Sequence, residues 1–242
     1  MLFKTIDVSI GSFNIEQGYT IFSRSNYQTK RHSHYAIEIV YCLNGSFDLI
    51  TAHTSHTGLQ SAVIPPNLAH GFSCINGSCD LLFLDPLSAI GSYFMQQYHL
   101  ASAKNVLLNV AGLDQLHQAG KFDISILSAL AEGKRIDHTD PRVLNCIKTI
   151  DTLFSDEKIS ISQLSETSFL SKDRLAHLFK AQMGISIHQY ILWKKISLAV
   201  LKSRTGHSLT TCAHFAGFAD SAHFNKAFYK MFGLTPSFVL KS

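Results

Sequence analysis

The stretch SLTTCAHFAGFADSAHFNKAFYKMFG, residues 208–233, decides how the second half of this chain folds. It opens on Ser208 with a short helical pattern, which Gly217 interrupts. A second helical pattern follows and ends at Gly233, a residue type favoured just beyond a helix. Two short helices joined by a tight turn form a helix-turn-helix unit. Its apolar core is predicted to contain Phe215, Phe218, Phe224 and Phe228.

A second copy of this pattern lies upstream, in SISQLSETSFLSKDRLAHLFKAQMG, residues 160–184. Both copies open with Ser followed three residues later by Gln or Thr, and Ser160 with Gln163 predicts a capping box. The turns are predicted to use the small residues Ser168 and Gly217. The chain therefore carries a tandem repeat of one supersecondary unit. The core of this copy is predicted to contain Leu164, Leu170, Leu175, Leu178 and Phe179.

Residues 187–203, IHQYILWKKISLAVLKS, connect the two copies and are predicted to form one amphipathic helix. At a rise of about 1.5 Å per residue, this helix would be roughly 25 Å long. That length would hold the second helices of the two units about one DNA turn apart.

The second helix of each unit has a polar exposed face, which argues against a helical bundle without a nucleic-acid role. Short polar and basic side chains suit phosphates and base edges. From Asp140 onward there are 13 Lys and Arg against 7 Asp and Glu, whereas residues 1–139 hold 8 against 10. The face residues are Lys172, Asp173, Arg174 and His177, and then Ser221, Asn225 and Lys226. Candidates for phosphate contacts are Lys180, Lys194, Lys195 and Lys202.

Residues 140–240 resemble the DNA-binding domain of the AraC/XylS family of bacterial transcription activators. The resemblance rests on the run AHFAGFADSAHFNKAFYKMFGLTPSFV, which keeps Gly217-Phe218, Asp220, Phe224, Phe228 and Gly233-Leu234-Thr235-Pro236. It implies a sequence-specific activator that binds two successive major-groove segments of double-stranded DNA. It also implies a homodimer and contact with RNA polymerase.

By position, the resemblance assigns base reading to two sets of four residues. Lys226 departs from the family, where Arg is more usual, and Ala176 and Ala222 cannot hydrogen-bond a base. Readout is therefore expected to depend on methyl contacts and phosphate positioning. The sets are Lys172, Asp173, Ala176 and His177 in the first unit, and Ser221, Ala222, Asn225 and Lys226 in the second.

Residues 1–85 have the pattern of a β domain, because short runs such as IEIVYCL and FDLIT alternate with turn signals such as NG and PPN. Regular short strands favour a sandwich or a barrel. Over residues 86–134 the apolar spacing becomes helical, which predicts one or two helices packed outside the barrel, as core or as a dimer surface. We expect a sensor and dimerisation domain at 1–134, a linker at 135–139 and an all-α tandem helix-turn-helix domain at 140–242. Asp140-Pro141 is the expected start of the first helix of that domain.

His32, His34 and Glu38 follow one another at spacings that place them on one face of a strand. Together with the later His70, they resemble the cupin pattern of HxH, Glu and a second-motif His. Asn67 stands where Gly is typical in that pattern, and Asn tolerates the same positive φ. The N-terminal domain is therefore identified as a cupin-like barrel.

The cupin resemblance implies two alternative roles for His32, His34, Glu38 and His70. Three imidazoles and a carboxylate suit Fe, Mn, Ni or Zn, in a metal-sensing regulator or a metal-dependent cupin enzyme. The other role is a polar lining for an unidentified small-molecule effector, which the attached helical domain favours. We therefore expect a regulator that is not an enzyme and needs no cofactor, with a divalent metal as the open alternative. Five other histidines are predicted to lie at the surface: His53, His56, His99, His117 and His138.

The N-terminus lacks a signal-peptide pattern, and no apolar run approaches the roughly 18 residues of a membrane span. The cysteines form no CxxC pair, which favours reduced thiols and a cytoplasmic location. They are Cys42, Cys74, Cys79, Cys146 and Cys212.

Overall fold

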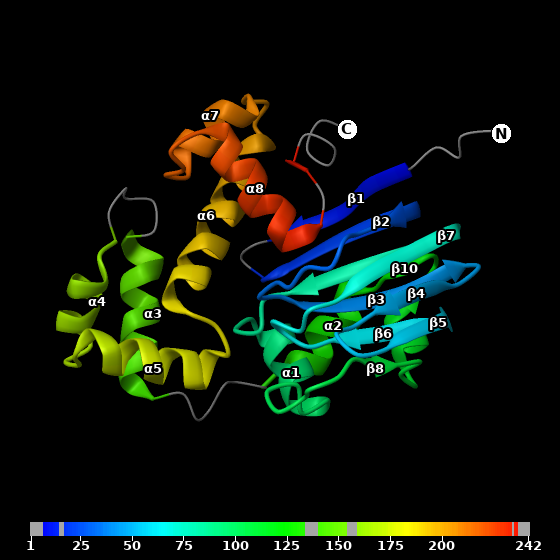
Figure 1. Ribbon diagram of the computed structural model, residues 1–242, viewed down its shortest axis with the longest axis horizontal. Helices are drawn as coiled ribbons and strands as arrows, with labels where there is room; N and C mark the ends of the chain where they lie inside the picture. The colour runs from blue at the N-terminus through cyan, green and yellow to red at the C-terminus, as the bar shows by residue number, and fades with distance from the viewer. Residues whose placement is uncertain (1–6, 15–16, 134–139, 154–158, 234, 237–242) are drawn as a thin grey trace. The chain divides into compact units, whose positions relative to one another are not determined.

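The computed structural model describes residues 7–14, 17–133, 140–153, 159–233 and 235–236 (Figure 1). The chain divides into two compact units. The first contains residues 1–135 with 230–234 and 241–242, and the second contains residues 136–229 with 235–240. The linker expected at 135–139 lies outside the described residues.

The first unit is a nearly closed β-barrel, as the short strand-like runs predict (Figure 1). Its sheet has the order β1-β2-β7-β3-β6-β8, and β4 pairs with both β5 and β7. All pairs of strands are antiparallel. The strands are β1 (Asp7–Asn14), β2 (Tyr19–Gln28), β3 (Ile37–Asn44), β4 (Phe47–Ile50), β5 (Ser55–Leu59), β6 (Ser61–Ile64), β7 (Gly71–Leu84) and β8 (Leu107–Leu108).

The long strand β7 organises the barrel, because it pairs with β2, β3 and β4. Its second half, from Cys79 to Leu84, is fully buried, as expected for a strand covered on both faces. Side chains alternate between the two faces of a strand. Leu82 and Leu84 therefore belong to one apolar cluster, whereas Leu81 and Phe83 point to the opposite side of the sheet.

Two helices cover the first of these faces: α1 (Ala89–Gln97) and α2 (Ile124–Ala131). Phe94 and Leu127 are fully buried against Ile21, Ile39 and Leu82 of the sheet. Each such side chain contributes about 1.5–3 kcal/mol by burial. The prediction of helices packed outside the barrel is confirmed, and their apolar residues are largely core. The short elements between them are η1 (Leu113–Leu116), β9 (His117–Gln118) and β10 (Lys121–Phe122).

Two loop residues have the backbone conformation that their types predict. Gly45, between β3 and β4, has φ of 78°, and its Cβ would lie 3.0 Å from the Asn76 carbonyl oxygen. Asn67 replaces the glycine of the cupin pattern and has φ of 62°. Asn is among the few residue types that tolerate this region, so the departure from the pattern leaves the turn intact.

The second unit is helical and holds, among the described residues, five helices and most of a sixth, whose last residues, 230–232, belong to the first unit (Figure 1). They are α3 (Pro141–Leu153), α4 (Ile161–Thr167), α5 (Lys172–Met183), α6 (Ile187–Ser203), α7 (Leu209–Phe215) and α8 (Ser221–Phe232). As predicted, α3 begins at Pro141, and the Asp140 carboxylate accepts a hydrogen bond from the Arg142 amide at 2.9 Å. The side chain of Arg142 lowers the pKa of Asp140 to about 2.

Serine hydroxyls cap the helices of the repeat. Ser160 accepts from the amide of Gln163, and Ser208 accepts from that of Thr211, so both copies start in the same way. The reciprocal pair of bonds that defines a capping box is present at Ser186 and Gln189, at the start of α6. With 17 residues, α6 is about 25 Å long, as the sequence predicts.

The turns of the two helix-turn-helix copies, residues 160–184 and 208–233, differ from the prediction in one respect. In the second helix-turn-helix copy, Gly217 has φ of 70° and follows the buried Ala216. In the first helix-turn-helix copy, the equivalent residue with positive φ is Phe169, with φ of 53°, and it follows the buried Ser168. Ser168 is therefore the counterpart of Ala216 and not of Gly217. The prediction that Ser168 and Gly217 are equivalent was wrong, because it assumed a small residue at each turn. The chain instead has the aromatic Phe169 at the position with positive φ.

No helix within the described ranges combines the length and apolarity that crossing a lipid bilayer requires.

Candidate nucleic-acid interface and barrel site

The first predicted recognition surface lies on α5. Leu175, Phe179 and Met183 are buried and fix the helix against its neighbours. The six residues proposed from the sequence all lie on the exposed side of the helix. Ser171 caps its first turn through the amide of Arg174. The exposed residues are Lys172, Asp173, Arg174, Ala176, His177 and Lys180.

The second predicted surface lies at the start of α8. Ala222 and Lys226 are exposed, whereas Ser221 and Asn225 are partly covered. Asn225 Oδ1 has no hydrogen-bond partner within the described part of the chain. The structure therefore leaves this buried acceptor unsatisfied. His223, which the sequence analysis did not select, is exposed in the same turn.

Three lysines on the connecting helix α6 have partners within the protein. Lys194 forms an ion pair with Asp151 at 3.0 Å, and Lys195 donates to the carbonyl oxygen of Gly217 at 2.8 Å. Lys202 lies 4.8 Å from the centre of the Phe215 ring. In the free protein, these contacts therefore hold the three side chains against neighbouring parts of the helical unit. By contrast, Lys180 is exposed on α5.

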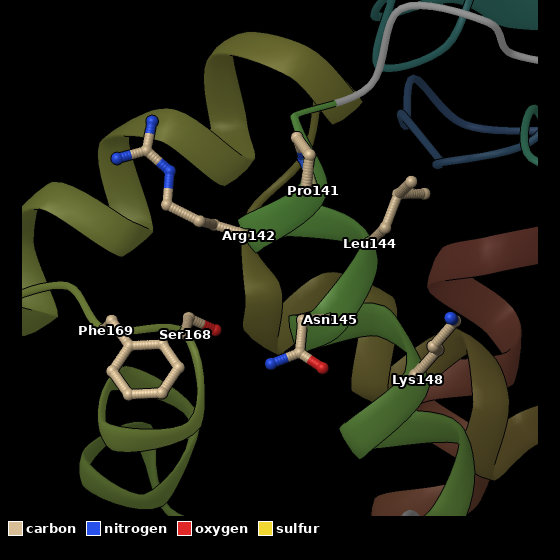
Figure 2. A pocket seen from close by; sticks show the side chains of 7 residues that line it. All are labelled: Pro141, Arg142, Leu144, Asn145, Lys148, Ser168 and Phe169. Carbon is tan, nitrogen blue, oxygen red and sulfur yellow. The ribbon is translucent and has the colours of Figure 1, made fainter.

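A shallow groove of about 380 Å³ lies between α3 and the turn that joins α4 to α5 (Figure 2). Asn145 donates from its amide to the carbonyl oxygen of Thr167 and so fixes the turn to α3. Phe169 is 90% exposed beside the groove. The residues that line it are Pro141, Arg142, Leu144, Asn145, Lys148, Ser168 and Phe169.

In the barrel, the histidines predicted from the cupin pattern come together. His32 pairs with His70 in an isolated β-bridge, and the ligating atoms of His32, His34 and His70 lie within 4.8 Å of one another. Glu38 Oε2 lies 2.9 Å from His34 Nε2 and 3.1 Å from His70 Nε2. His34, Glu38 and His70 are buried, and His32 is partly exposed.

The backbone determines which nitrogen of each imidazole carries hydrogen. Nδ1 of His32, His34 and His70 lies 2.8–3.0 Å from a main-chain carbonyl oxygen, which can only accept. Nδ1 is therefore a donor in all three rings, and His34 and His70 also donate from Nε2 to the Glu38 carboxylate, so metal binding at those atoms would require loss of the Nε2 hydrogens. Histidines that bind metals through Nε2 commonly have Nδ1 fixed on a carbonyl oxygen in this way.

Charge within this cluster follows from burial and from the shared carboxylate. Burial raises the pKa of Glu38, but the hydrogen bonds from His34 and His70 outweigh it and hold that pKa well below its usual value. Burial lowers the pKa of His70, but its bond to Glu38 reverses the effect and raises it. Burial, with the neighbouring His70 and His34, lowers the pKa of His32 to about 4. The cluster therefore combines one ionised carboxylate with a neutral imidazole at His32.

One prediction about the remaining histidines is wrong. The side chain of His117 is only 4% exposed, and its Nε2 lies 2.8 Å from Asp80 Oδ2. Its ring stacks on Tyr41 with centroids 4.5 Å apart. The isolated position of His117 in the sequence gave no sign of this, because its partners come from two strands far earlier in the chain. His138 lies outside the described residues.

Comparison with known proteins agrees with this architecture at the C-terminal end. Residues 164–242 match a helix-turn-helix domain family. The probable transcriptional regulator LumQ from Photobacterium leiognathi is 38% identical over 82 residues, which are 34% of this chain and 33% of LumQ. The arabinose operon regulatory protein of Escherichia coli is 33% identical over 99 residues, covering 40% of this chain and 34% of that protein. Over these C-terminal residues the chain is similar to transcriptional regulators of the AraC type. It matches only about a third of the length of these curated relatives.

The fold is also similar to that of a solved two-domain structure. ToxT from Vibrio cholerae superposes with a TM-score of 0.59, covering 92% of this chain and 97% of ToxT at 16% identity. A second ToxT structure contains a bound unsaturated fatty acid and has a TM-score of 0.56 at 15% identity, covering 90% of this chain and 92% of ToxT. At these identities the likeness concerns the fold: a barrel unit and a helical unit in one chain.

Within the AraC-type domain, the family signature is mostly structural. Phe218, Phe224 and Phe228 are buried, with ring centroids 5.3 and 5.8 Å apart in successive pairs. Gly217 and Gly233 both have positive φ, of 70° and 67°. The residues that carry the resemblance therefore lie in the apolar core and at the turns.

Proposed function

We propose that this protein is a sequence-specific DNA-binding transcription activator, controlled by a small molecule bound in the N-terminal barrel. The observation that carries the proposal is the pair of exposed helix faces on α5 and α8, each built by a capped helix-turn-helix unit. The single helix α6, about 25 Å long, joins the two units. That length suits two recognition helices in successive major-groove segments.

The proposed contacts divide into two kinds. His177 and Asn225 are polar and short enough to hydrogen-bond base edges, and Ala176 and Ala222 supply methyl contacts to thymine. Lys172, Arg174, Lys180 and Lys226 are cations suited to phosphates, which position the protein without reading sequence. Asp173 and Ser221 complete the proposed surface, as partners for cytosine amino groups or for phosphate oxygens, respectively.

The barrel is the proposed sensor. Support comes from the fold that it shares with ToxT, which has been solved with an unsaturated fatty acid bound. His32, His34, Glu38 and His70 are the proposed polar residues of the effector site. An effector changes DNA binding only if it binds one conformational state of the regulator better than the other.

Further parts of the proposal rest on the family resemblance. The protein is proposed to act as a homodimer, to contact RNA polymerase and to work in the cytoplasm. The domain limits remain 1–134 for the sensor and dimerisation domain, 135–139 for the linker and 140–242 for the DNA-binding domain. Sedimentation of the purified chain with and without DNA tests the dimer directly.

The central experiment selects bound fragments from genomic DNA and then measures affinity for a selected site and for random DNA at one stated salt concentration. We expect the selected site to bind at least about a thousandfold more tightly, as is typical of specific regulators. Equal affinity for both DNAs would instead indicate a nucleoid-type protein. Failure to bind either DNA would reject the proposal.

A metal-sensing regulator or metal-dependent cupin enzyme is the second candidate, because three buried or partly buried Nε2 atoms converge. The donor set fits a divalent cation: three imidazoles with Nδ1 fixed on carbonyls, and the carboxylate of Glu38 beside them. Such an ion would polarise an oxygen atom of a bound ligand. The chain's residues would hold it and exclude water.

Metal analysis of the purified protein decides between the two candidates. Stoichiometric metal that is lost in His34→Ala and His70→Ala, with unchanged far-ultraviolet circular dichroism, supports the metal site. His53→Ala is the matched control, since His53 is exposed and outside the cluster. No metal uptake by the chelated wild-type protein, on addition of Zn²⁺, Mn²⁺, Ni²⁺ or Fe²⁺, would reject it.

A further inference from the structure

Helix α8 is divided between the two units. Residues 221–229 belong to the second unit, whereas the last residues of the helix, 230–232, belong to the first unit together with Gly233. The proposed DNA-reading residues lie in the first part of the helix, between Ser221 and Lys226. The helix therefore carries the proposed DNA contacts near one end and ends among residues of the barrel unit at the other.

Phe232, the last residue of α8, packs inside the barrel unit and is only 1% exposed. The centroid of its ring lies 5.5 Å from that of Phe22 on β2 and 5.3 Å from that of Phe83 on β7, both in edge-to-face geometry. Phe22 and Phe83 also contact each other, with centroids 5.7 Å apart. The three rings form one cluster, and such aromatic pairs stabilise a fold beyond the area that they bury.

Two side chains of β2 bind the carbonyl groups at the end of α8 and just beyond it. Arg24 donates from a terminal guanidinium nitrogen to the carbonyl oxygen of Phe232 at 3.2 Å, and the hydroxyl of Tyr27 donates to the carbonyl oxygen of Gly233. The last four carbonyl groups of a helix have no partner within the helix. The helix dipole also favours a cation at this end. Arg24 and Tyr27 therefore form a C-terminal cap that a distant part of the chain supplies.

Arg24 is a buried cation, only 2% exposed, on the same face of β2 as Phe22. Burial lowers its pKa, and electrostatic interactions with Tyr27, Glu38 and Cys79 oppose that effect. Its central carbon lies 4.6 Å from the ring centre of Tyr27 and 5.2 Å from that of Phe22. Because a charge loses its hydration when it is buried, it is retained inside a protein only with such compensating contacts. These contacts hold the guanidinium group in the place from which it caps α8.

Gly233 lets the chain leave α8 at this place. Its φ is 67°, a conformation that glycine adopts readily just beyond a helix. A Cβ on this residue would lie 2.7 Å from Cγ2 of Thr29, which directly follows β2. The close approach of the barrel unit is therefore a second reason for glycine here, besides the backbone conformation.

The first helix-turn-helix copy provides an internal comparison. Its second helix, α5, ends in the same way, with Met183 followed by Gly184 at φ of 70°. Gly184 is exposed, however, and lies with the whole of α5 in the second unit. Gly233 is buried. Of the two proposed recognition helices, α8 is thus the one whose end the barrel unit holds.

We propose that Arg24 and Tyr27 are positioning residues for DNA recognition, because they hold the last turn of α8 and so preorganise this helix for DNA. The proposal rests on the DNA-binding function proposed above. A helix whose end is already held loses less conformational entropy on binding than a helix with a frayed end. Neither residue needs to touch DNA for this effect.

Fluorescence anisotropy with the full-length protein tests the proposal, at a temperature well below the unfolding midpoint of each variant. Arg24→Gln and Tyr27→Phe should each weaken binding to a selected DNA site by about three- to tenfold. The salt slope should stay unchanged, because neither side chain contacts a phosphate. Tyr27→Phe keeps the ring and removes the hydroxyl, so it isolates the hydrogen bond to Gly233. Arg31→Gln is the matched control, since Arg31 is exposed in the barrel unit and should leave the affinity unchanged.

Amide hydrogen exchange provides a readout that a general loss of stability would not mimic. Both variants should exchange faster at residues 231–233, while the protection of α5 and of β7 stays unchanged. Faster exchange throughout the barrel would assign the two residues a role in barrel stability alone and overturn the proposal. Unchanged DNA affinity in both variants would also overturn it. So would tighter DNA binding, which would mean that the barrel unit keeps α8 from DNA.

The positioning proposal and the DNA-binding proposal fail in different ways. Specific DNA binding by the wild type that both variants retain in full would reject the role of Arg24 and Tyr27 alone. A wild type that does not distinguish selected from random DNA would reject the regulator, and with it the positioning role, whatever the exchange rates are.

Discussion

Lys195 donates a hydrogen bond from Nζ to the carbonyl oxygen of Gly217 at 2.8 Å. The bond joins the connecting helix α6 to the turn between α7 and α8. Gly217 has φ of 70°, and a Cβ on it would lie 2.9 Å from the same Nζ. The backbone conformation therefore favours glycine at this turn, and a Cβ would displace the Lys195 ammonium group.

Gly217→Ala is expected to destabilise the helical unit by about 1–3 kcal/mol, through strain at positive φ and displacement of Lys195. Urea unfolding followed by circular dichroism measures the change. Gly206→Ala is the matched control, because Gly206 has φ of 79° but nothing within 4 Å of its Cβ position. The control should be destabilised only by the strain of placing alanine at positive φ. Equal destabilisation of the two variants would show that the Lys195 contact contributes nothing.

Phe169→Gly is expected to stabilise the protein by about 1 kcal/mol, because glycine relieves the positive φ and the phenylalanine buries little surface. The φ of Phe169 is 53°, and its side chain is 90% exposed. Thermal unfolding should show a higher midpoint for this variant. Phe169→Leu keeps the strain and should show no gain. If Phe169→Gly lowers the midpoint, the ring contributes packing that its exposure does not suggest.

Lys180 and His177 should affect DNA binding in different ways. Lys180→Ala should weaken binding to selected and random DNA alike and flatten the salt dependence of log K by about one unit. His177→Ala should chiefly reduce the preference for the selected site. Fluorescence anisotropy at several salt concentrations measures both. Identical behaviour of the two variants would reject the assignment of α5 as a recognition helix.

Lys195→Met should behave unlike Lys180→Ala. Because Lys195 is bonded to Gly217, its replacement is expected to lower stability by about 1 kcal/mol and to leave the salt slope of DNA binding unchanged. Urea unfolding and anisotropy titrations on the same preparation check the two effects. A reduced salt slope with unaltered stability would place Lys195 at a phosphate instead.

The thiols should be unreactive in the folded protein. All five cysteines are free and buried, and burial raises the pKa of Cys146 to about 11. The hydrogen bond from Cys79 lowers the pKa of Cys74, so burial alone protects that thiol. Thiolate is the reactive form, so a thiol reagent at pH 8 should react slowly with the native protein and rapidly with five thiols after denaturation. Fast reaction of the native protein would reveal opening of the fold around these residues.

The sequence predicts the elements of both units because their periodic patterns are local. The start of α3 at Pro141, the connecting helix and the positive φ of Asn67 follow from single residues or short windows. The convergence of His32, His34 and His70 was also predictable, because the spacing on strands fixes their faces.

What the sequence does not predict depends on long-range pairing. His117 is buried because Asp80 and Tyr41 meet it on the helix-covered side of the sheet, and no local pattern encodes that meeting. The burial of Arg24 on β2 could be predicted only if the strand were known to be covered on both faces, because Arg24 lies on the same face as the apolar Phe22. Phe169 was missed because small residues are the usual choice at such a turn.

The central position of β7 also bears on how the protein forms. Its residues pair with β2, β3 and β4, so the barrel needs contacts between segments far apart in the chain. The helical unit is built mostly from neighbouring helices. Chains with local contacts fold faster, because they lose less entropy in closing loops. The barrel is therefore expected to set the rate of folding, and the pairing of β2, β3 and β4 with β7 cannot be completed on the ribosome until residue 84 has emerged.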